Sequence, residues 1–291
     1  MRTDGRHERE GLNVLSTGGV TVVVHDLTGE DRTDREPVLL AHATGFHGYV
    51  WQPLADHLQG FRAYAPDLRG HGDATPPDNG DFAWDGFADD VLAVVARLGI
   101  TGAPAVGHSK GGAALLLAEQ RRPGTFRSLY LYEPVLIPPT VLETSRVDNP
   151  LAEGALRRRP VFPSRDAAYA NFASKPPLSA LDAAALRAYV DHGFEDQPDG
   201  TVRLKCAPES ESEVYRMGSR HGAFEQLHAV SCPVTVARGA VLEFGPANFA
   251  ESIVDALPDG RLEVFDHLGH FGPLERPAEV ATAIERFLTE T

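Results

Sequence analysis

Six consecutive residues, Gly107-His108-Ser109-Lys110-Gly111-Gly112, surround a serine with closely spaced glycines. They follow a short apolar run at 103–106 and precede an Ala- and Leu-rich segment at 111–119. This arrangement is typical of a sharp strand-to-helix turn that carries a nucleophilic serine at its apex. Glycine two residues before and two residues after Ser109 removes the Cβ atoms that would crowd such a strained turn. The next helix then offers free backbone N–H groups beside the hydroxyl.

A serine hydroxyl becomes a good nucleophile only when a neighbouring base takes its proton. Among the 12 histidines, His270 is the best placed, because it lies in a short loop after a predicted strand at 261–265. The carboxyl ends of parallel strands meet at one edge of a sheet, so this loop is expected on the same side as Ser109. The sequence therefore predicts that His270 activates Ser109.

Strands and helices that can position this pair alternate along the chain. β-branched and aliphatic runs predict strands at 20–25, 38–42, 61–66, 103–106, 128–132, 233–238 and 261–265. Apolar residues at helical spacing, or the strand–helix order, predict helices at 51–58, 87–98, 111–119, 247–257 and 278–288. Gly99 is the predicted stop of the second helix. Nearly continuous apolar strands that alternate with helices indicate a parallel sheet covered on both faces.

The character of the chain changes between residue 134 and about residue 220. Prolines interrupt short helical segments such as 179–190, and Asp199-Gly200 marks a turn before a short strand at 201–206. We therefore predict a core formed by residues 1–133 and 221–291, with a mostly helical cap, or lid, inserted at 134–220.

Three further segments accompany the serine motif: His42-Ala43-Thr44-Gly45-Phe46, Asp67-Leu68-Arg69-Gly70-His71-Gly72, and the histidine loop from Gly269 to Pro277. With these motifs the chain resembles the α/β-hydrolase fold superfamily along essentially its whole length. The resemblance implies an α/β fold with a mostly parallel eight-stranded sheet, helices on both faces and a helical cap. Related dehalogenases and epoxide hydrolases use a carboxylate nucleophile at the elbow. Serine at that position implies acyl transfer instead.

The superfamily also has an acid that orients the histidine. Most members carry it after the strand that corresponds to 234–238, about three residues past a glycine. Counted from Gly239, that position is Leu242, which cannot serve, and Glu243 is one residue further on.

Other branches of the superfamily carry the acid after the preceding strand, where Glu133 stands. Pro134 follows it directly and is expected to end that strand and hold the acid at the sheet edge. We favour Glu133 as the acid, with Glu243 as the alternative and Asp266 as a third candidate.

The resemblance places the oxyanion hole on the backbone N–H groups of Thr44 and Lys110. The usual His-Gly pair before the first of these is His42-Ala43 here. For the Lys110 side chain, solvation or an ion pair with an acid such as Glu133 is favoured over contact with an anionic substrate. Asp67 is expected to bind turn amides within its own loop.

Composition limits the remaining possibilities. The net charge of −14 over 291 residues disfavours nucleic-acid and anionic-membrane partners. Cys206 and Cys232 have no metal-ligand spacing and are expected to be reduced thiols. Residues 1–10 lack the apolar segment of a secretory signal, and no run approaches the roughly 18 apolar residues of a membrane span. We expect a cytoplasmic protein without metal or cofactor that acts on a small molecule, with a homodimer left open.

Three functions follow from these residues. The leading hypothesis is a serine hydrolase that cleaves a carboxylic ester, thioester or lactone through an acyl-enzyme. Relatives with the same residues also hydrolyse C–C bonds or act as lyases or cyclases, because the fold does not choose the chemistry. A non-catalytic ligand sensor is the third hypothesis, disfavoured by the intact Ser109/His270 pair.

Overall fold

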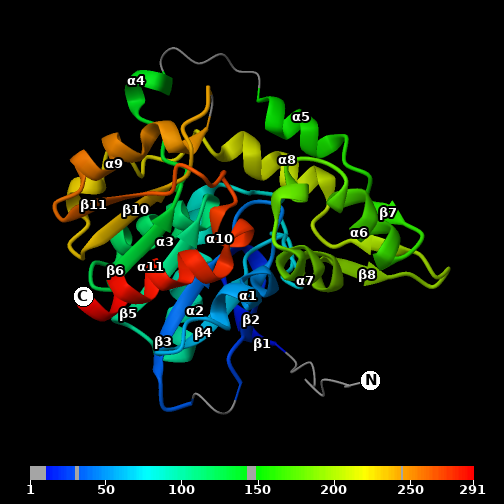
Figure 1. Ribbon diagram of the computed structural model, residues 1–291, viewed down its shortest axis with the longest axis horizontal. Helices are drawn as coiled ribbons and strands as arrows, with labels where there is room; N and C mark the ends of the chain where they lie inside the picture. The colour runs from blue at the N-terminus through cyan, green and yellow to red at the C-terminus, as the bar shows by residue number, and fades with distance from the viewer. Residues whose placement is uncertain (1–10, 30–32, 143–148, 244) are drawn as a thin grey trace.

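The computed structural model describes residues 11–29, 33–142, 149–243 and 245–291. At its centre lies an eight-stranded sheet in the order β1-β2-β4-β3-β5-β6-β10-β11 (Figure 1). β1 pairs antiparallel with β2, and β2 pairs antiparallel with β4, whereas the five remaining pairs are parallel. The strands are β1 (Leu12–Leu15), β2 (Thr21–Asp26), β3 (Glu36–Ala41), β4 (Phe61–Asp67), β5 (Ala103–His108), β6 (Phe126–Tyr132), β10 (Val234–Arg238) and β11 (Gly260–Val264). The predicted α/β fold with a mostly parallel eight-stranded sheet is confirmed.

One face of the sheet is covered by three helices that share an apolar cluster. Phe87, Leu116 and Ile253 are fully buried members of this cluster, one from each helix. The second of the predicted helices ends at Gly99, whose φ of 67° is the left-handed conformation that glycine adopts readily at helix ends. The helices are α2 (Trp84–Leu98), α3 (Lys110–Arg121) and α9 (Ala250–Ala256).

The opposite face carries a second apolar cluster. Leu54, Leu274 and Ile284 belong to it, and so do residues of the 134–220 segment such as Tyr189. Because it shares this cluster, the 134–220 segment packs on the sheet and its helices through apolar side chains. The core helices on this face are α1 (Gln52–Ala55), α10 (Gly272–Glu275) and α11 (Pro277–Glu290).

The segment predicted as a cap contains helices and a small sheet. Its helices are α4 (Pro139–Leu142), α5 (Pro150–Leu156), α6 (Arg165–Ala173), α7 (Ala183–Gly193) and α8 (Pro208–Met217). Its strands are β7 (Val161–Phe162), β8 (Phe194–Asp196) and β9 (Val202–Leu204), which form an antiparallel sheet in the order β7-β9-β8. The predicted short strand corresponds to β9, while its two partners were not predicted.

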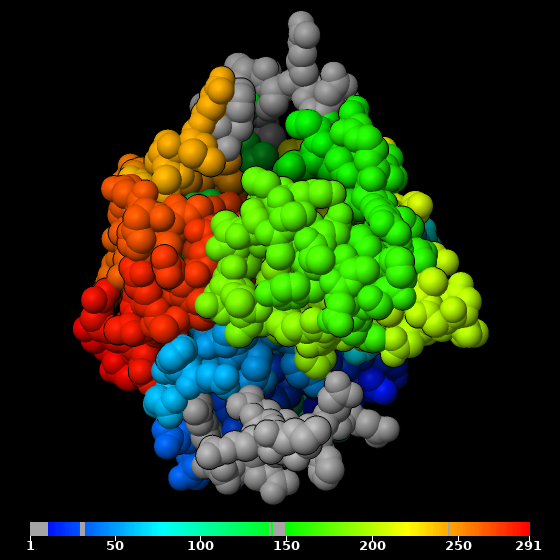
Figure 2. All heavy atoms as spheres, turned by 45° about the vertical axis from the view of Figure 1, so that its right-hand side comes forward, coloured from blue at the N-terminus to red at the C-terminus, as the bar shows by residue number. Residues whose placement is uncertain are grey.

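Figure 2 shows this segment, in green, over the middle of one face, to the right of the red and orange C-terminal elements and above the light blue region of α1. Cys206 and Cys232 are both buried free thiols, as predicted. Among the described residues, no helix combines the length and the apolar content that crossing a membrane requires.

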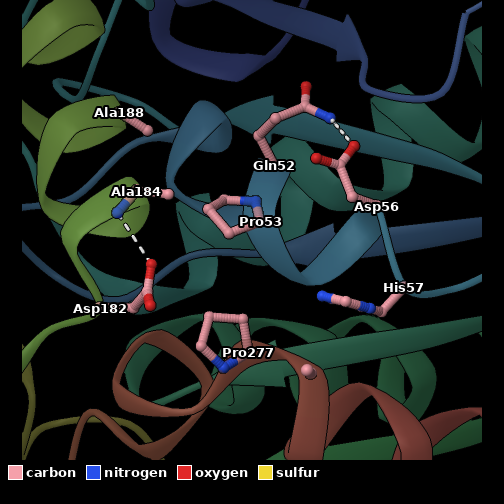
Figure 3. A pocket seen from close by; sticks show the side chains of 9 residues that line it. Gln52, Pro53, Asp56, His57, Asp182, Ala184, Ala188 and Pro277 are labelled. Carbon is pink, nitrogen blue, oxygen red and sulfur yellow. Dashed lines mark hydrogen bonds between the residues drawn. The ribbon is translucent and has the colours of Figure 1, made fainter.

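A surface pocket of about 350 Å³ lies between α1 and the N-terminal ends of α7 and α11 (Figure 3). Its two acids are engaged in local bonds, since Asp182 accepts from Ala184 N (2.8 Å) and Asp56 accepts from Gln52 Nε2 (2.8 Å). Neither Ser109 nor any other predicted site residue lines this pocket.

Candidate active site

Ser109 lies between β5 and α3 with φ 55° and ψ −118°, a conformation that L-residues rarely adopt. A Cβ on Gly107 would lie 2.6 Å from the Gly112 Cα, and one on Gly111 would lie 2.2 Å from the Ala41 carbonyl oxygen. Both distances are far below van der Waals contact, so the turn requires glycine at these positions. The prediction that the flanking glycines make room for a strained serine is confirmed.

Glu133 follows β6 directly and has a φ of 44°. Ser109 and Glu133 are the two non-glycine residues of the described chain with positive φ. The Glu133 N–H donates to the Ala237 carbonyl (2.8 Å), and its Oε1 accepts from the Gly239 N–H (2.8 Å). The end of β10 therefore fixes both the backbone and the carboxylate of this residue.

The second carboxylate oxygen of Glu133 contacts His270. The distance from Oε2 to Nδ1 is 2.6 Å, and the Glu133 side chain is 2% exposed. An ionised carboxylate can only accept, so the proton of the neutral ring is assigned to Nδ1, which leaves Nε2 as an acceptor. This is the nitrogen that a base acting on a serine hydroxyl needs.

The other two candidate acids lie elsewhere. Glu243 is exposed, and its carbonyl accepts from Asn248. Asp266 pairs with Arg238 (2.9 Å) and is 77% exposed. Among the described contacts, His270 is joined to Glu133 and to neither of these residues.

The loop that carries His270 is held by residues that sequence reasoning missed. His108 Nε2 donates to the His270 carbonyl (2.8 Å), and Tyr132 Oη donates to the Gly269 carbonyl (2.9 Å). Burial lowers the pKa of His108 well below its ordinary value, so the ring is neutral and donates from one nitrogen. The sequence signal that could have identified His108 is its position directly before Ser109, because this position faces the loop after β11 that carries His270.

The predicted oxyanion loop lies against the elbow. A Cβ on Gly111 would be 2.8 Å from the His42 carbonyl, so the backbones of the two segments touch. His42 donates from Nδ1 to the Ala43 carbonyl (2.8 Å) and accepts at Nε2 from the Leu68 N–H (3.1 Å). Burial lowers the pKa of His42 well below its ordinary value, and the neutral ring ties the loops after β3 and β4 together. The structure thus places the Ala41–His42 backbone, two to three residues before the buried Thr44, against the start of α3.

The side chain of Lys110 is buried rather than solvated, and the favoured expectation for it is wrong. It is 0% exposed, its Nζ has no hydrogen-bond partner among the described residues, and the centroid of the Phe87 ring lies 4.3 Å from Nζ. It does not pair with Glu133. Burial lowers the pKa of Lys110 to about 7. Helix α3 buries nearly all of its side chains, and the lysine is enclosed with them.

Asp67 organises the loop after β4, as predicted. It accepts from the Gly48 N–H (2.6 Å), the Asp73 N–H (2.8 Å) and His25 Nε2 (3.0 Å). Within the described chain, the one group of three that could hold a metal ion consists of His25, Asp67 and Asp73. Asp73 is also paired with Lys205 (2.5 Å). Protein donors already occupy these carboxylates.

The α/β fold, with Ser109 and the hydrogen-bonded Glu133 and His270 at the carboxyl edge of the sheet, defines a hydrolase of the α/β class. A model of the alpha/beta hydrolase family matches residues 38–283, and the chain belongs to that family. A strigolactone esterase from Arabidopsis thaliana is 26% identical over 260 residues, which cover 86% of this chain and 91% of that protein. A bifunctional esterase/perhydrolase from Acinetobacter calcoaceticus is 46% identical over 122 residues, 38% of this chain and 39% of that protein. The structure of an E-2-(acetamidomethylene)succinate hydrolase has a TM-score of 0.79 at 23% identity and covers 96% of this chain and 98% of its own.

Proposed function

We propose that this protein is a cofactor-independent serine hydrolase that cleaves a carboxylic ester, thioester or lactone through an acyl-enzyme on Ser109. The observation that carries the proposal is the 2.6 Å hydrogen bond between Glu133 and His270. It lies at the sheet edge where β5 ends in a strained serine. Two relatives are named as esterases, which supports ester cleavage over cleavage of a C–C bond.

In the proposed reaction, His270 Nε2 takes the proton of Ser109 as the serine oxygen attacks the substrate carbonyl. Glu133 keeps the imidazole in the required tautomer and stabilises the imidazolium that forms. The backbone N–H groups of Thr44 and Lys110 donate to the oxyanion of the tetrahedral intermediate. His270 then protonates the leaving group, and a water molecule hydrolyses the acyl-enzyme with His270 as the base.

Labelling with a fluorophosphonate, together with turnover of p-nitrophenyl esters of graded length, tests the reaction class. The wild type is expected to be labelled at Ser109 and to release a burst of phenolate. Ser109→Ala should abolish both signals. A wild type that no activated ester or fluorophosphonate acylates contradicts the proposal and favours C–C bond hydrolysis or lyase chemistry.

A matched pair of variants tests the acid. Glu133→Gln is expected to lower the rate of acylation by about a hundredfold or more, because the amide no longer supports the imidazolium. Glu243→Gln makes the same chemical change on an exposed side chain and serves as the control. The assignment is wrong if the Glu243 variant loses labelling while the Glu133 variant retains it.

A further inference from the structure

The strand β11 (Gly260–Val264) forms one outer edge of the central sheet. It is the last strand in the sheet order, and among the described residues it pairs with β10 alone (Figure 1). The strand has five residues, contains no proline and pairs with β10 without a shift of register. Prolines and bulges are devices that stop an edge strand from pairing with another chain. Neither device protects this edge.

The bonds to β10 determine which backbone groups of β11 face outward. The Asp259 carbonyl accepts from β10 (2.9 Å), and the Phe265 N–H donates to β10 (2.8 Å). Bonds to one neighbouring strand involve every second residue, so the odd-numbered residues from 259 to 265 face β10. The backbone N–H and C=O groups that point away from β10 are those of Gly260, Leu262 and Val264.

Exposed apolar side chains accompany these outward groups. A Cβ on Gly260 would lie 2.6 Å from the Val254 carbonyl oxygen in α9, so the even-numbered side chains lie on the α9 face of the sheet. On that face Leu262 and Val264 are 38% and 40% exposed. Arg261 lies on the opposite face, where its guanidinium is 5.9 Å from the ring centroid of Phe287 in α11. The edge therefore combines unpaired backbone groups with exposed apolar surface.

A second copy of β11 fits this edge in one register. Two copies that run antiparallel can place Leu262 of one opposite Leu262 of the other, so that the outward groups of both bond to each other. Arg261 of each copy then stands opposite Glu263 of the other, in a pair whose side chains lie close together. Opposite charges in such a pair are stabilising.

Other twofold registers are less favourable. A shift of one step in either direction keeps the backbone bonds but places Arg261 opposite Arg261, or Glu263 opposite Glu263. Like charges directly opposite each other are destabilising. A further shift toward the start of the strand brings in Pro258, which has no N–H to donate. The charges thus select the register centred on Leu262.

Both charged side chains can take part in such a pair. Glu263 accepts from the Tyr130 hydroxyl at Oε2 (2.7 Å) and from Arg286 at Oε1 (2.5 Å), which holds its carboxylate in place. A carboxylate has about four acceptor sites, so each oxygen can accept a further bond. The Arg261 guanidinium is half exposed and lies 3.9 Å from Asp259, too far for a hydrogen bond.

We propose that this protein forms a twofold homodimer by antiparallel pairing of β11 with β11 of a second copy, so that one sheet runs through both subunits. A partner strand must present the reverse order of charges, and β11 itself does so when it is turned antiparallel. The inference goes beyond the proposed hydrolase function and does not depend on it.

A cysteine at position 262 tests the register, because this residue lies on the twofold axis. Cα atoms in a hydrogen-bonded antiparallel pair are about 5.5 Å apart, a distance that a disulfide spans. Under mild oxidation Leu262→Cys should form a covalent dimer, seen by non-reducing electrophoresis. The native Cys206 and Cys232 are buried and should not contribute.

Leu15→Cys is the matched control on the opposite edge strand, where Leu15 is 82% exposed. Without a partner held beside it, this cysteine should cross-link about tenfold or more slowly than the one at position 262. Equal rates of cross-linking for the two variants overturn the proposed interface.

Sedimentation velocity tests the dimer without a cross-link. The wild type should sediment with twice the chain mass of 31.4 kDa, and a wild type that remains at the chain mass at every concentration overturns the proposal. Arg261→Glu places like charges opposite each other twice and should raise the Kd of the dimer about tenfold or more. Arg97→Glu makes the same change on an exposed residue of α2, which contacts β1 and β2 instead, and should sediment as the wild type does.

Leu262→Pro tests the backbone bonds. Proline removes the outward N–H of this residue and leaves the bonds between β11 and β10 intact, so the variant should fold and sediment as a monomer. A dimer that persists in both Leu262→Pro and Arg261→Glu uses another surface and overturns the inference. If Leu262→Pro does not fold, as judged by its urea midpoint, Arg261→Glu decides the question, because that side chain is at the surface.

Discussion

Replacing Lys110 with methionine should stabilise this protein, and the gain should depend on pH. The amine is fully buried, no residue in the described part of the chain accepts a hydrogen bond from its Nζ, and burial lowers its pKa from 10.5 to about 7. Methionine has a similar length and no charge to desolvate. The backbone N–H at this position, which is the proposed oxyanion donor, is kept by the substitution.

The size of the effect follows from the two pKa values of Lys110. Between pH 7 and 10.5 the unfolded chain holds a proton on this amine that the folded chain does not, so the stability of the wild type rises with pH. One pH unit of difference corresponds to about 1.36 kcal/mol. The penalty is therefore about 4 kcal/mol at pH 7 and about 1 kcal/mol at pH 10. Attraction of the charged form to the Phe87 ring offsets up to about 2 kcal/mol of it.

Urea unfolding of the wild type and of Lys110→Met at pH 7 and pH 10 measures this difference. The variant should be more stable by about 2–4 kcal/mol at pH 7, and the advantage should shrink toward pH 10. Lys175→Met is the control, because that lysine is exposed and should show no such dependence. A variant that is no more stable than the wild type at pH 7, or an advantage that does not shrink, refutes the reasoning.

Three further substitutions test the packing of the site. Gly111→Ala places a Cβ 2.2 Å from the Ala41 carbonyl oxygen and should cost about 3 kcal/mol or more in the free energy of unfolding, measured in urea. Stability close to that of the wild type would contradict the close packing of the turn around Ser109. His108→Leu removes the donor to the His270 carbonyl and should lower kcat about tenfold with little change in KM; a change in KM alone would assign it to substrate binding. Arg69→Met removes the ion-pair partner of the fully buried Asp90 carboxylate and should cost about 3–5 kcal/mol in the free energy of unfolding, seen as a lower urea midpoint. An unchanged midpoint would show that the Asp90 carboxylate is protonated or hydrated.

Strand prediction succeeded where a strand is buried on both faces. Every residue of β5 is buried, and its apolar run before the serine predicted it directly. β1 (Leu12–Leu15) was missed because it is an edge strand with a single buried residue, Val14, while its apolar Leu15 is 82% exposed. Hydrophobic alternation carries little information when one side of a short strand faces solvent.

Two helices were predicted at shifted positions for local reasons. The segment predicted as a helix at 179–190 forms α7 (Ala183–Gly193), because the Asp182 side chain caps the Ala184 N–H and so sets the first turn. The helix predicted at 51–58 is reduced to α1 (Gln52–Ala55), which follows a 3-10 turn at Gly48–Trp51. Capping and turn geometry decide these boundaries, and the pattern of apolar residues carries little information about either.

Motifs were enough to predict Ser109 and His270 as site residues, whereas the choice among the candidate acids required spatial information. Spacing along the chain allowed Glu133 and Glu243, because a strand end and a loop position both satisfy the pattern. The hydrogen bond to His270 spans 137 positions of sequence.

The two strained residues of the described chain show how the sheet supports the site. Ser109 N donates to the Tyr132 carbonyl (3.0 Å), and Glu133 N donates to the Ala237 carbonyl (2.8 Å). Each bond continues the parallel strand pairing by one residue. The neighbouring strand therefore holds Ser109 at a φ of 55° and Glu133 at a φ of 44°. Strain of this kind costs about 1–3 kcal/mol per residue and persists only where the surroundings over-determine it. Because β6 holds Ser109 and β10 holds Glu133, a change that loosens the end of β10 should act first on Glu133, the proposed acid.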